Sequence, residues 1–228
     1  MRIEDLNWMD VEEYLKHDDR LMLVVGACEQ HGYLSLLSDV KIPLALADAA
    51  SKQTGVLVAP SLNFGSSPYF LDYPGTLSLR LSTLLDAVED IVRSSYGQGF
   101  KRILVLNGHG GNSGVKMRLG ELANQLNGLK IQWYGWWMAH SVEEVAKRHE
   151  IKPEHANWLE AFPFTIVSDL PKGEKVPPRV PSDVMDAKTA RVVYGDGSFG
   201  GKYQVSEEVM QELFEAVLAD ILQLLKFD

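Results

Sequence analysis

"LMLVVGAC", residues 21–28, is an almost unbroken apolar run, and it decides the fold class. A strand reads this way when helices cover both faces of a parallel sheet. "RILVLN" (102–107) has the same character, and further runs at 56–60 and 130–137 also indicate strands. Helical patterns follow the strands, at 42–55, 82–95, 115–125, through "SVEEVAKRHE" and at 206–225. This alternation predicts an α/β fold with a mostly parallel central sheet.

Composition excludes several classes of protein. The 228 residues are 46% hydrophobic, which suffices for one core, so we expect a single domain over residues 1–228. The net charge is −9 without a long Lys/Arg cluster, so we expect no nucleic-acid partner. No apolar stretch reaches membrane-spanning length, and the N-terminal stretch carries acids where a signal peptide is basic. We therefore expect no membrane partner and a cytoplasmic protein.

Groups that bind metal follow two of the predicted strands. Glu29 and His31 lie two residues apart, so they share one side if the strand continues that far. Asp39 follows after a short excursion, and His109 lies just beyond "RILVLN". Because Cys28 is the only cysteine, a metal would be held by imidazole and carboxylate. Such a set suits zinc, manganese or iron, and one carboxylate could bridge two ions.

These segments could also be ordinary solvated loops or a phosphate-binding loop. Taken singly, a Glu or His at a strand end is usually a solvated loop residue, but their co-occurrence after two buried strands favours a site. "NGHGGNSG" (107–114) could instead cradle a phosphate. The glycine pattern fails, since Ser113 stands at its closing position and no Gly-Lys-Ser/Thr follows. We expect the aromatic run at 133–137 to lie in the core, although one Trp of the run could line a pocket.

Four segments carry a resemblance to a known family. "GACEQHG", "DYPGTLSL", "NGHGGN" and "HANWLE" are similar, in the same order, to signature segments of the creatininase (creatinine amidohydrolase) family, and "YGDGSFGGKYQVSEE" is similar to its C-terminal Gly-Asp segment. The resemblance implies a three-layer α/β/α sandwich and hydrolysis of a cyclic or linear C–N amide bond in a small molecule. It also implies one or two divalent ions, with Zn²⁺ first and Mn²⁺ or Fe²⁺ as alternatives, and frequently a homohexamer.

The resemblance also assigns roles to individual residues. Asp39 matches the bridging carboxylate, and His155 matches a proton-transferring residue that faces the substrate. The implied metal ligands are Glu29, His31, Asp39, His109 and Glu160. The expected substrate-binding residues are Tyr33, Phe70, Asn112 and Trp158.

Three departures from the family pattern concern the surroundings of these ligands. "EQHGYLSLLSD" is one residue shorter than usual, with Tyr33 where a second His would fall. Gly111 stands where creatininases proper have a metal-binding Glu, and Phe70 stands about where a His is expected. A kept ligand set with a changed pocket is typical of a family member that takes another substrate.

We therefore expect a metal-dependent amidohydrolase in which metal-activated water attacks a carbonyl carbon. Two alternatives stay open. One is a deformylase or peptidase of the same family that acts on a modified nucleotide or a peptide precursor. The other is a homologue that binds metal without catalysis.

Overall fold

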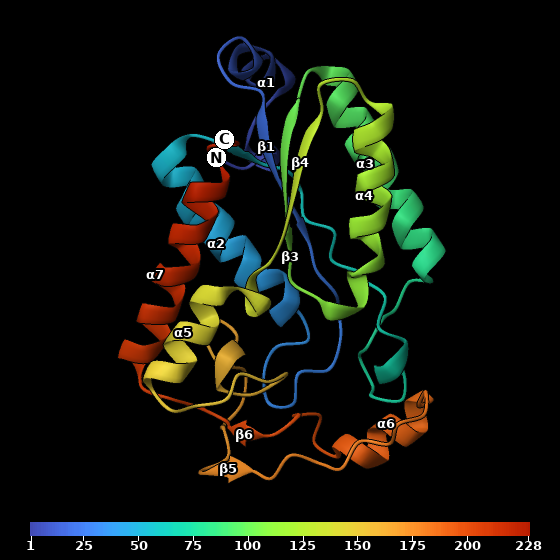
Figure 1. Ribbon diagram of the computed structural model, residues 1–228, viewed down its shortest axis with the longest axis vertical. Helices are drawn as coiled ribbons and strands as arrows, with labels where there is room; N and C mark the ends of the chain where they lie inside the picture. The colour runs from blue at the N-terminus through green and yellow to red at the C-terminus, as the bar shows by residue number, and fades with distance from the viewer.

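A four-stranded parallel sheet lies at the centre of the protein, described here over all 228 residues by a computed structural model (Figure 1). Its strands are ordered β2-β1-β3-β4. Their bounds are Arg20–Val25 (β1), Leu57–Val58 (β2), Arg102–Asn107 (β3) and Lys130–Gly135 (β4). In the central pair, Arg20 lies opposite Arg102 and Val25 opposite Asn107, so β1 and β3 end at the same edge.

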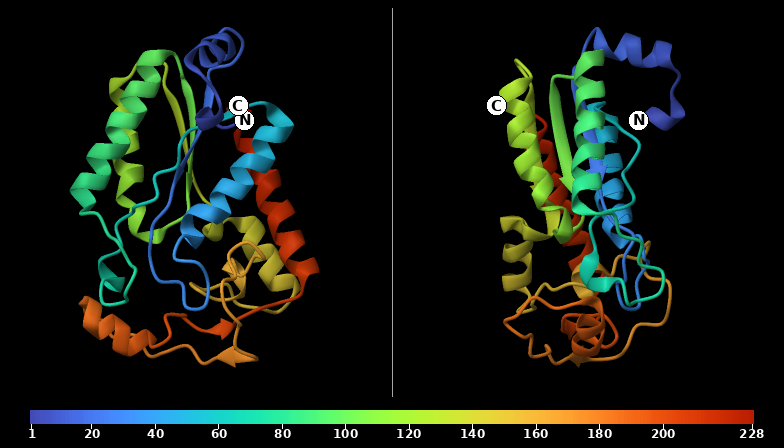
Figure 2. Two further views of the ribbon diagram at one scale, coloured as in Figure 1. Left: turned by 180° about the vertical axis from the view of Figure 1, so that it is seen from behind. Right: turned by 90° about the vertical axis from the view of Figure 1, so that its right-hand side faces the viewer.

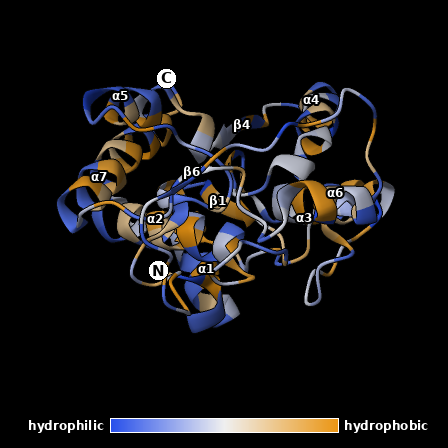
Figure 3. Cartoon of the chain, turned by 90° about the horizontal axis from the view of Figure 1, so that it is seen from below, coloured by the Kyte–Doolittle hydropathy of each residue, from blue (hydrophilic) through white to orange (hydrophobic).

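Helices cover both faces of this sheet. One layer contains α2 (Ser38–Thr54), α5 (His140–Arg148) and α7 (Glu207–Leu224), and the other contains α3 (Leu81–Gln98) and α4 (Gly114–Gln125). Figure 2 shows the two layers from further sides, and Figure 3 shows them from below, on either side of β1 and β4. The three-layer α/β/α fold with a parallel central sheet is thereby confirmed.

Successive residues of the central strands enter two different cores. Met22 and Val24 pack in the cluster that includes residues of α2, α5 and α7. Leu21 and Leu23 pack in the cluster that includes residues of α3 and α4. Side chains alternate between the faces of a strand, and each fully buried Leu or Val stabilises by roughly 1.5–3 kcal/mol. This double burial explains why the strands read as continuous apolar runs.

The elements differ from the sequence prediction mainly at their ends. The strand expected over 21–28 ends at Val25, and the helix expected over 42–55 begins at Ser38. Two helices, α1 (Trp8–Leu15) and α6 (Ala187–Tyr194), were not expected. The start of α1 is fixed by a capping box, in which Asn7 accepts hydrogen bonds from the backbone of Met9 and Asp10.

Loops and short elements gather at the carboxyl edge of the sheet. There β5 (Glu174–Lys175) pairs with β6 (Gly201–Lys202), and α6 lies beside them at the lower end of Figure 1. Five short 3-10 helices complete the chain: η1 (Ile3–Asp5), η2 (Pro68–Phe70), η3 (Gly110–Asn112), η4 (Trp136–Met138) and η5 (Trp158–Glu160). None of the helices has the length and apolar character needed to cross a membrane.

Candidate metal centre

Glu29 and His31 reach the site from an irregular segment, so the condition that the strand continues as far as these residues is not met. The strand ends at Val25, and residue 28 forms only an isolated bridge with Leu77. The side chains still converge, because the His31 ring turns back on the segment with Nδ1 3.1 Å from the Glu29 carbonyl oxygen. The pair therefore lies in irregular backbone, and strand alternation does not set its geometry.

Asp39 lies in the first turn of α2, which packs against the ends of both central strands. A Cβ atom on Gly108 would lie 1.8 Å from the Asp39 carbonyl oxygen, and one on Gly26 would lie 2.6 Å from it. That oxygen also lacks its usual helical partner, since Pro43, four residues on, has no N–H. Two glycines and one proline therefore let the helix start lie between the strand ends.

His109 lies two residues beyond β3, and its ring orientation is fixed. Its Nε2 lies 2.9 Å from the Ser66 carbonyl oxygen and 3.2 Å from the Ser67 hydroxyl. Because a carbonyl can only accept, Nε2 donates, which leaves Nδ1 as the nitrogen that can give a lone pair to a bound metal. Asn107 steadies the loop by donating to the His109 carbonyl oxygen at 2.8 Å.

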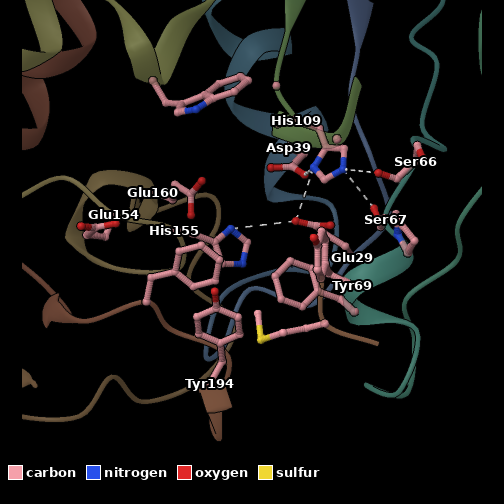
Figure 4. A pocket seen from close by; sticks show the side chains of 18 of the residues that line it. Glu29, Asp39, Ser66, Ser67, Tyr69, His109, Glu154, His155, Glu160 and Tyr194 are labelled. Atoms are coloured by element: carbon pink, nitrogen blue, oxygen red, sulfur yellow. Dashed lines mark hydrogen bonds and ion pairs between the residues drawn. The ribbon is translucent and has the colours of Figure 1, made fainter. Parts of the chain in front are cut away.

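Five buried side chains form two groups that share Asp39. Ligand atoms within 4.8 Å of one another come from Glu29, Asp39 and His109 in the first group and from His31, Asp39 and Glu160 in the second. Nδ1 of His109 lies 2.9 Å from Asp39 Oδ2 and 3.4 Å from Glu29 Oε1. Nε2 of His31 lies 2.9 Å from Asp39 Oδ1 and 3.8 Å from Glu160 Oε1. Figure 4 shows Glu29, Asp39 and His109 directed toward one another.

Opposite charges perturb the pKa values of this cluster. Burial opposes a charge on His31, but Asp39 and Glu160 outweigh it and raise the pKa of His31 to about 10. The pKa of His109 is raised well above its ordinary value, where burial is outweighed by Glu29 and Asp39. Asp39 is held at a lowered pKa, because both imidazoles outweigh its burial. Burial dominates at Glu160 and raises its pKa to about 7. Without metal, protons on the imidazoles compensate the carboxylates.

Two carboxylate oxygens in the cluster fit the requirements of a divalent ion. Glu29 Oε2 is buried and has no hydrogen-bond partner, and the buried Asp39 Oδ2 lies 2.9 Å from His109 Nδ1. A buried carboxylate without a partner is costly, and native proteins usually pair such groups or coordinate a metal with them. Three carboxylates and two imidazoles are suitable donors for zinc or manganese. The residues present therefore fit a centre of one or two ions.

His155 lies beside this cluster, with Nδ1 3.9 Å from Glu29 Oε1. Its other nitrogen, Nε2, lies 2.9 Å from the Gln30 side-chain nitrogen. The Gln30 amide is oriented by backbone on both sides, since its oxygen accepts from Gly32 N–H and its nitrogen donates to the Gly197 carbonyl. Gln30 must then donate to His155 Nε2, which places the ring proton on Nδ1. Burial and the neighbouring His31 lower the pKa of His155 to about 4, so the ring is neutral.

A cavity of about 870 Å³ opens over the cluster. Its wall includes His155 and four of the five expected metal ligands, Glu29, Asp39, His109 and Glu160, while His31 lies behind them. Phe70 and Trp137 also line it. Sequence reasoning named Phe70, allowed for one Trp from the aromatic run, and missed Gln30.

Of the four expected substrate-binding residues, Phe70 lines the cavity, whereas Tyr33, Asn112 and Trp158 do not. Trp158 is fully buried, and its indole donates to the Lys152 carbonyl at 2.8 Å. Asn112 is fully buried and donates to the Gly26 carbonyl at 3.0 Å, which ties the His109 loop to β1. Tyr33 packs edge-on against Tyr203, with ring centroids 5.7 Å apart. All three side chains are engaged elsewhere in the structure.

Comparison with known proteins gives one family and several relatives. The family model described as "Creatininase: Creatinine amidohydrolase" matches residues 4–225. A creatinine amidohydrolase of Pseudomonas putida is 32% identical over 165 residues, which are 67% of this chain and 63% of that protein. A mycofactocin precursor peptide peptidase of Mycolicibacterium smegmatis is 34% identical over 99 residues, or 40% of each chain. These matches span less than two thirds of either relative's length.

Solved structures agree over almost the whole chain. One described as "Creatininase Mn" superposes on 97% of this chain and 96% of that chain, with a TM-score of 0.81 and 25% identity. A mutant creatininase described as "Zn-Zn type" superposes on 97% of this chain and 95% of that chain, with a TM-score of 0.80 and 27% identity.

Proposed function

Because this chain belongs to the creatininase family, we propose that it is a metal-dependent hydrolase of a C–N amide bond in a small molecule. One observation carries the proposal: two ligand groups share Asp39, and Glu29, which has a buried carboxylate oxygen without a partner, lies with them at the wall of a cavity. We propose that residues 1–228 act as one amidohydrolase domain, and the homohexamer implied by the resemblance stays a prediction.

The proposed metal ligands fall into two sets. Glu29, Asp39 and His109 would hold one ion, and His31, Asp39 and Glu160 would hold a second. Zn²⁺ is our first choice for this nitrogen and oxygen set, with Mn²⁺ or Fe²⁺ as alternatives. When bound, the metal would lower the pKa of a bound water from its bulk value to about 7 and polarise the substrate carbonyl.

His155 supplies a hydrogen-bond donor, which revises the proton delivery expected from its sequence segment. An imidazole with a pKa of about 4 carries no extra proton to give at neutral pH. Its Nδ1–H faces the ligand cluster, because Gln30 occupies Nε2. A neutral N–H at this place can stabilise negative charge that develops on the substrate carbonyl oxygen. Gln30 is then a positioning residue that keeps His155 in the useful tautomer.

Gln30→Met tests this role of the amide. Methionine keeps the length of the side chain but donates nothing, so we expect kcat to fall roughly 10–100-fold with little change in KM or metal content. Nitrogen-15 NMR of histidine-labelled protein should show the His155 proton moving off Nδ1, with the resonance assigned by its loss in His155→Gln. An unchanged tautomer with reduced kcat would mean that Gln30 acts only on the surrounding structure.

A peptidase acting on a peptide precursor is the second candidate. The similarity to a mycofactocin precursor peptide peptidase and the large cavity both favour it. It uses the same ligand set and the same attack of water on an amide carbon, so the two candidates differ only in what enters the cavity. A homologue that binds metal without catalysis is separated from both by assay.

Removal and return of metal test the proposed function. We expect chelator-treated protein to be inactive and Zn²⁺ or Mn²⁺ to restore hydrolysis of at least one member of a panel of creatinine, cyclic amides, linear amides and short peptides. Mass-spectrometric product analysis and metal analysis of the same samples give the readout. Stoichiometric metal without hydrolysis of any member would leave the non-catalytic homologue, and failure to bind metal would end the proposal.

A further inference from the structure

The outer wall of the cavity is aromatic where it adjoins His155. Phe70 stacks on the His155 ring with centroids 5.2 Å apart and an interplanar angle of 8°. Phe199 lies 4.8 Å from His155 and stacks on Tyr194 at 4.2 Å. Tyr194 lies at the base of the view in Figure 4, with the His155 ring between it and the ligand cluster. We call Phe70, Tyr194 and Phe199 the aromatic wall.

The size of the cavity exceeds what a single small ring needs. Pockets for drug-sized ligands hold about 300–1,000 Å³, and this one holds about 870 Å³. Met185 packs against the cluster that contains Phe70 and Tyr194, and Trp137 and Val180 also line the cavity. Such a lining gains its binding free energy by removing apolar surface of a ligand from water.

Outside the candidate metal centre, the charged side chains that line the cavity are all acidic. None of its 24 lining residues is Lys or Arg, while Glu154 and Asp183 add two carboxylates. The carboxylate of Glu154 is paired with Lys152 at 2.5 Å, and Lys152 itself does not line the cavity. A free carboxylate on the distal part of a substrate would find no basic side chain in the lining and would face the carboxylate of Asp183.

We propose that the substrate is an amide with a bulky apolar or aromatic substituent and without a free carboxylate on that substituent. The inference rests on the proposed function, and it names the substrate class of the same site. Hydrolysis adds one water: the C–N bond breaks, the hydroxyl joins the acyl carbon and the hydrogen goes to the nitrogen. The substituent lies along the aromatic wall, while the scissile amide lies between His155 and the ligand cluster.

Matched ligands test the substrate class by binding as well as by turnover. Hydantoin, benzyl hydantoin and hydantoin acetic acid share one cyclic amide and differ only in the substituent. Calorimetric titration of the metal-free protein should show benzyl hydantoin binding at least about tenfold tighter than hydantoin, because the phenyl ring is buried. Hydantoin acetic acid should bind more weakly than hydantoin. The same order is expected for kcat/KM in the metal-loaded protein.

Variants of the wall locate the effect. Phe199→Ala should lower the affinity ratio of benzyl hydantoin to hydantoin, and Glu154→Gln should raise the affinity for hydantoin acetic acid. Val192→Ala is the control on α6, since Val192 is 84% exposed and does not line the cavity. Circular dichroism checks that each variant folds.

The outcomes separate this inference from the proposed function. Equal affinities for hydantoin and benzyl hydantoin, or tighter binding of hydantoin acetic acid, would overturn the substrate class even if hydrolysis occurs. The expected order of affinities without turnover of any amide would support the substrate class and overturn the proposed activity.

Discussion

Asp39→Asn is expected to remove bound metal and hydrolysis together. Asp39 is the one residue common to both ligand groups, and its two oxygens face different imidazoles. An Asn amide offers one neutral oxygen and an NH₂ group that would face an imidazole. Loss of an outer partner of a ligand typically costs 10–100-fold in metal affinity, so loss of a shared ligand should cost more than about 100-fold. Activity should fall to the level of the chelator-treated protein.

The measurement is metal content after dialysis against a buffered zinc concentration, together with hydrolysis of the best panel substrate. Asp86→Asn is the matched control, because its side chain is 72% exposed on α3 and lies outside both groups. We expect this control to keep wild-type metal content. Retention of two ions per chain by Asp39→Asn would rule out a bridging role for this carboxylate.

The parallel sheet was predictable because its strands are buried on both faces and therefore read as uninterrupted apolar runs. The bounds of β3 agree with the prediction at both ends. Helices α1 and α6 were missed since each has only eight residues and too few turns to show a clear periodicity. Only the N-terminal capping residues could have indicated these helices. For α1 they are Asn7 and Asp10, and for α6 the capping residue is Asp186, which accepts from Thr189 N–H.

The residues of the site were easier to name than to place. Glu29 and His31 lie in an irregular segment beyond β1, where two-residue periodicity does not apply. Trp158 was expected at the substrate, but its 3-10 helix, capped by Asn157, carries it into the core. Gln30 carries no signal in a single sequence, because its role depends on the distant Gly197 and His155. Local patterns find ligands, whereas the partners that orient them come from tertiary contacts.

Gly111→Ala is expected to destabilise the protein and displace His109, whereas Gly110→Ala is not. A Cβ atom on Gly111 would lie 1.9 Å from the Ser66 carbonyl oxygen and 2.5 Å from His109 Nε2, the two atoms of one hydrogen bond. On Gly110 the nearest atom, in Trp137, lies at 4.0 Å. Neither glycine has a positive φ, so the pair isolates the steric clash from backbone strain.

Overpacking of this kind costs about 1–3 kcal/mol, and a displaced His109 should weaken metal binding by a further ~10–100-fold. Urea denaturation of the metal-free variants measures the first effect, and zinc titration measures the second. Gly111→Glu should behave like Gly111→Ala and gain no ligand, because the backbone here leaves no room for any side chain. Equal stability of the two alanine variants would show that the loop can move, and a zinc affinity raised by Gly111→Glu would show that the family's glutamate can still be accommodated.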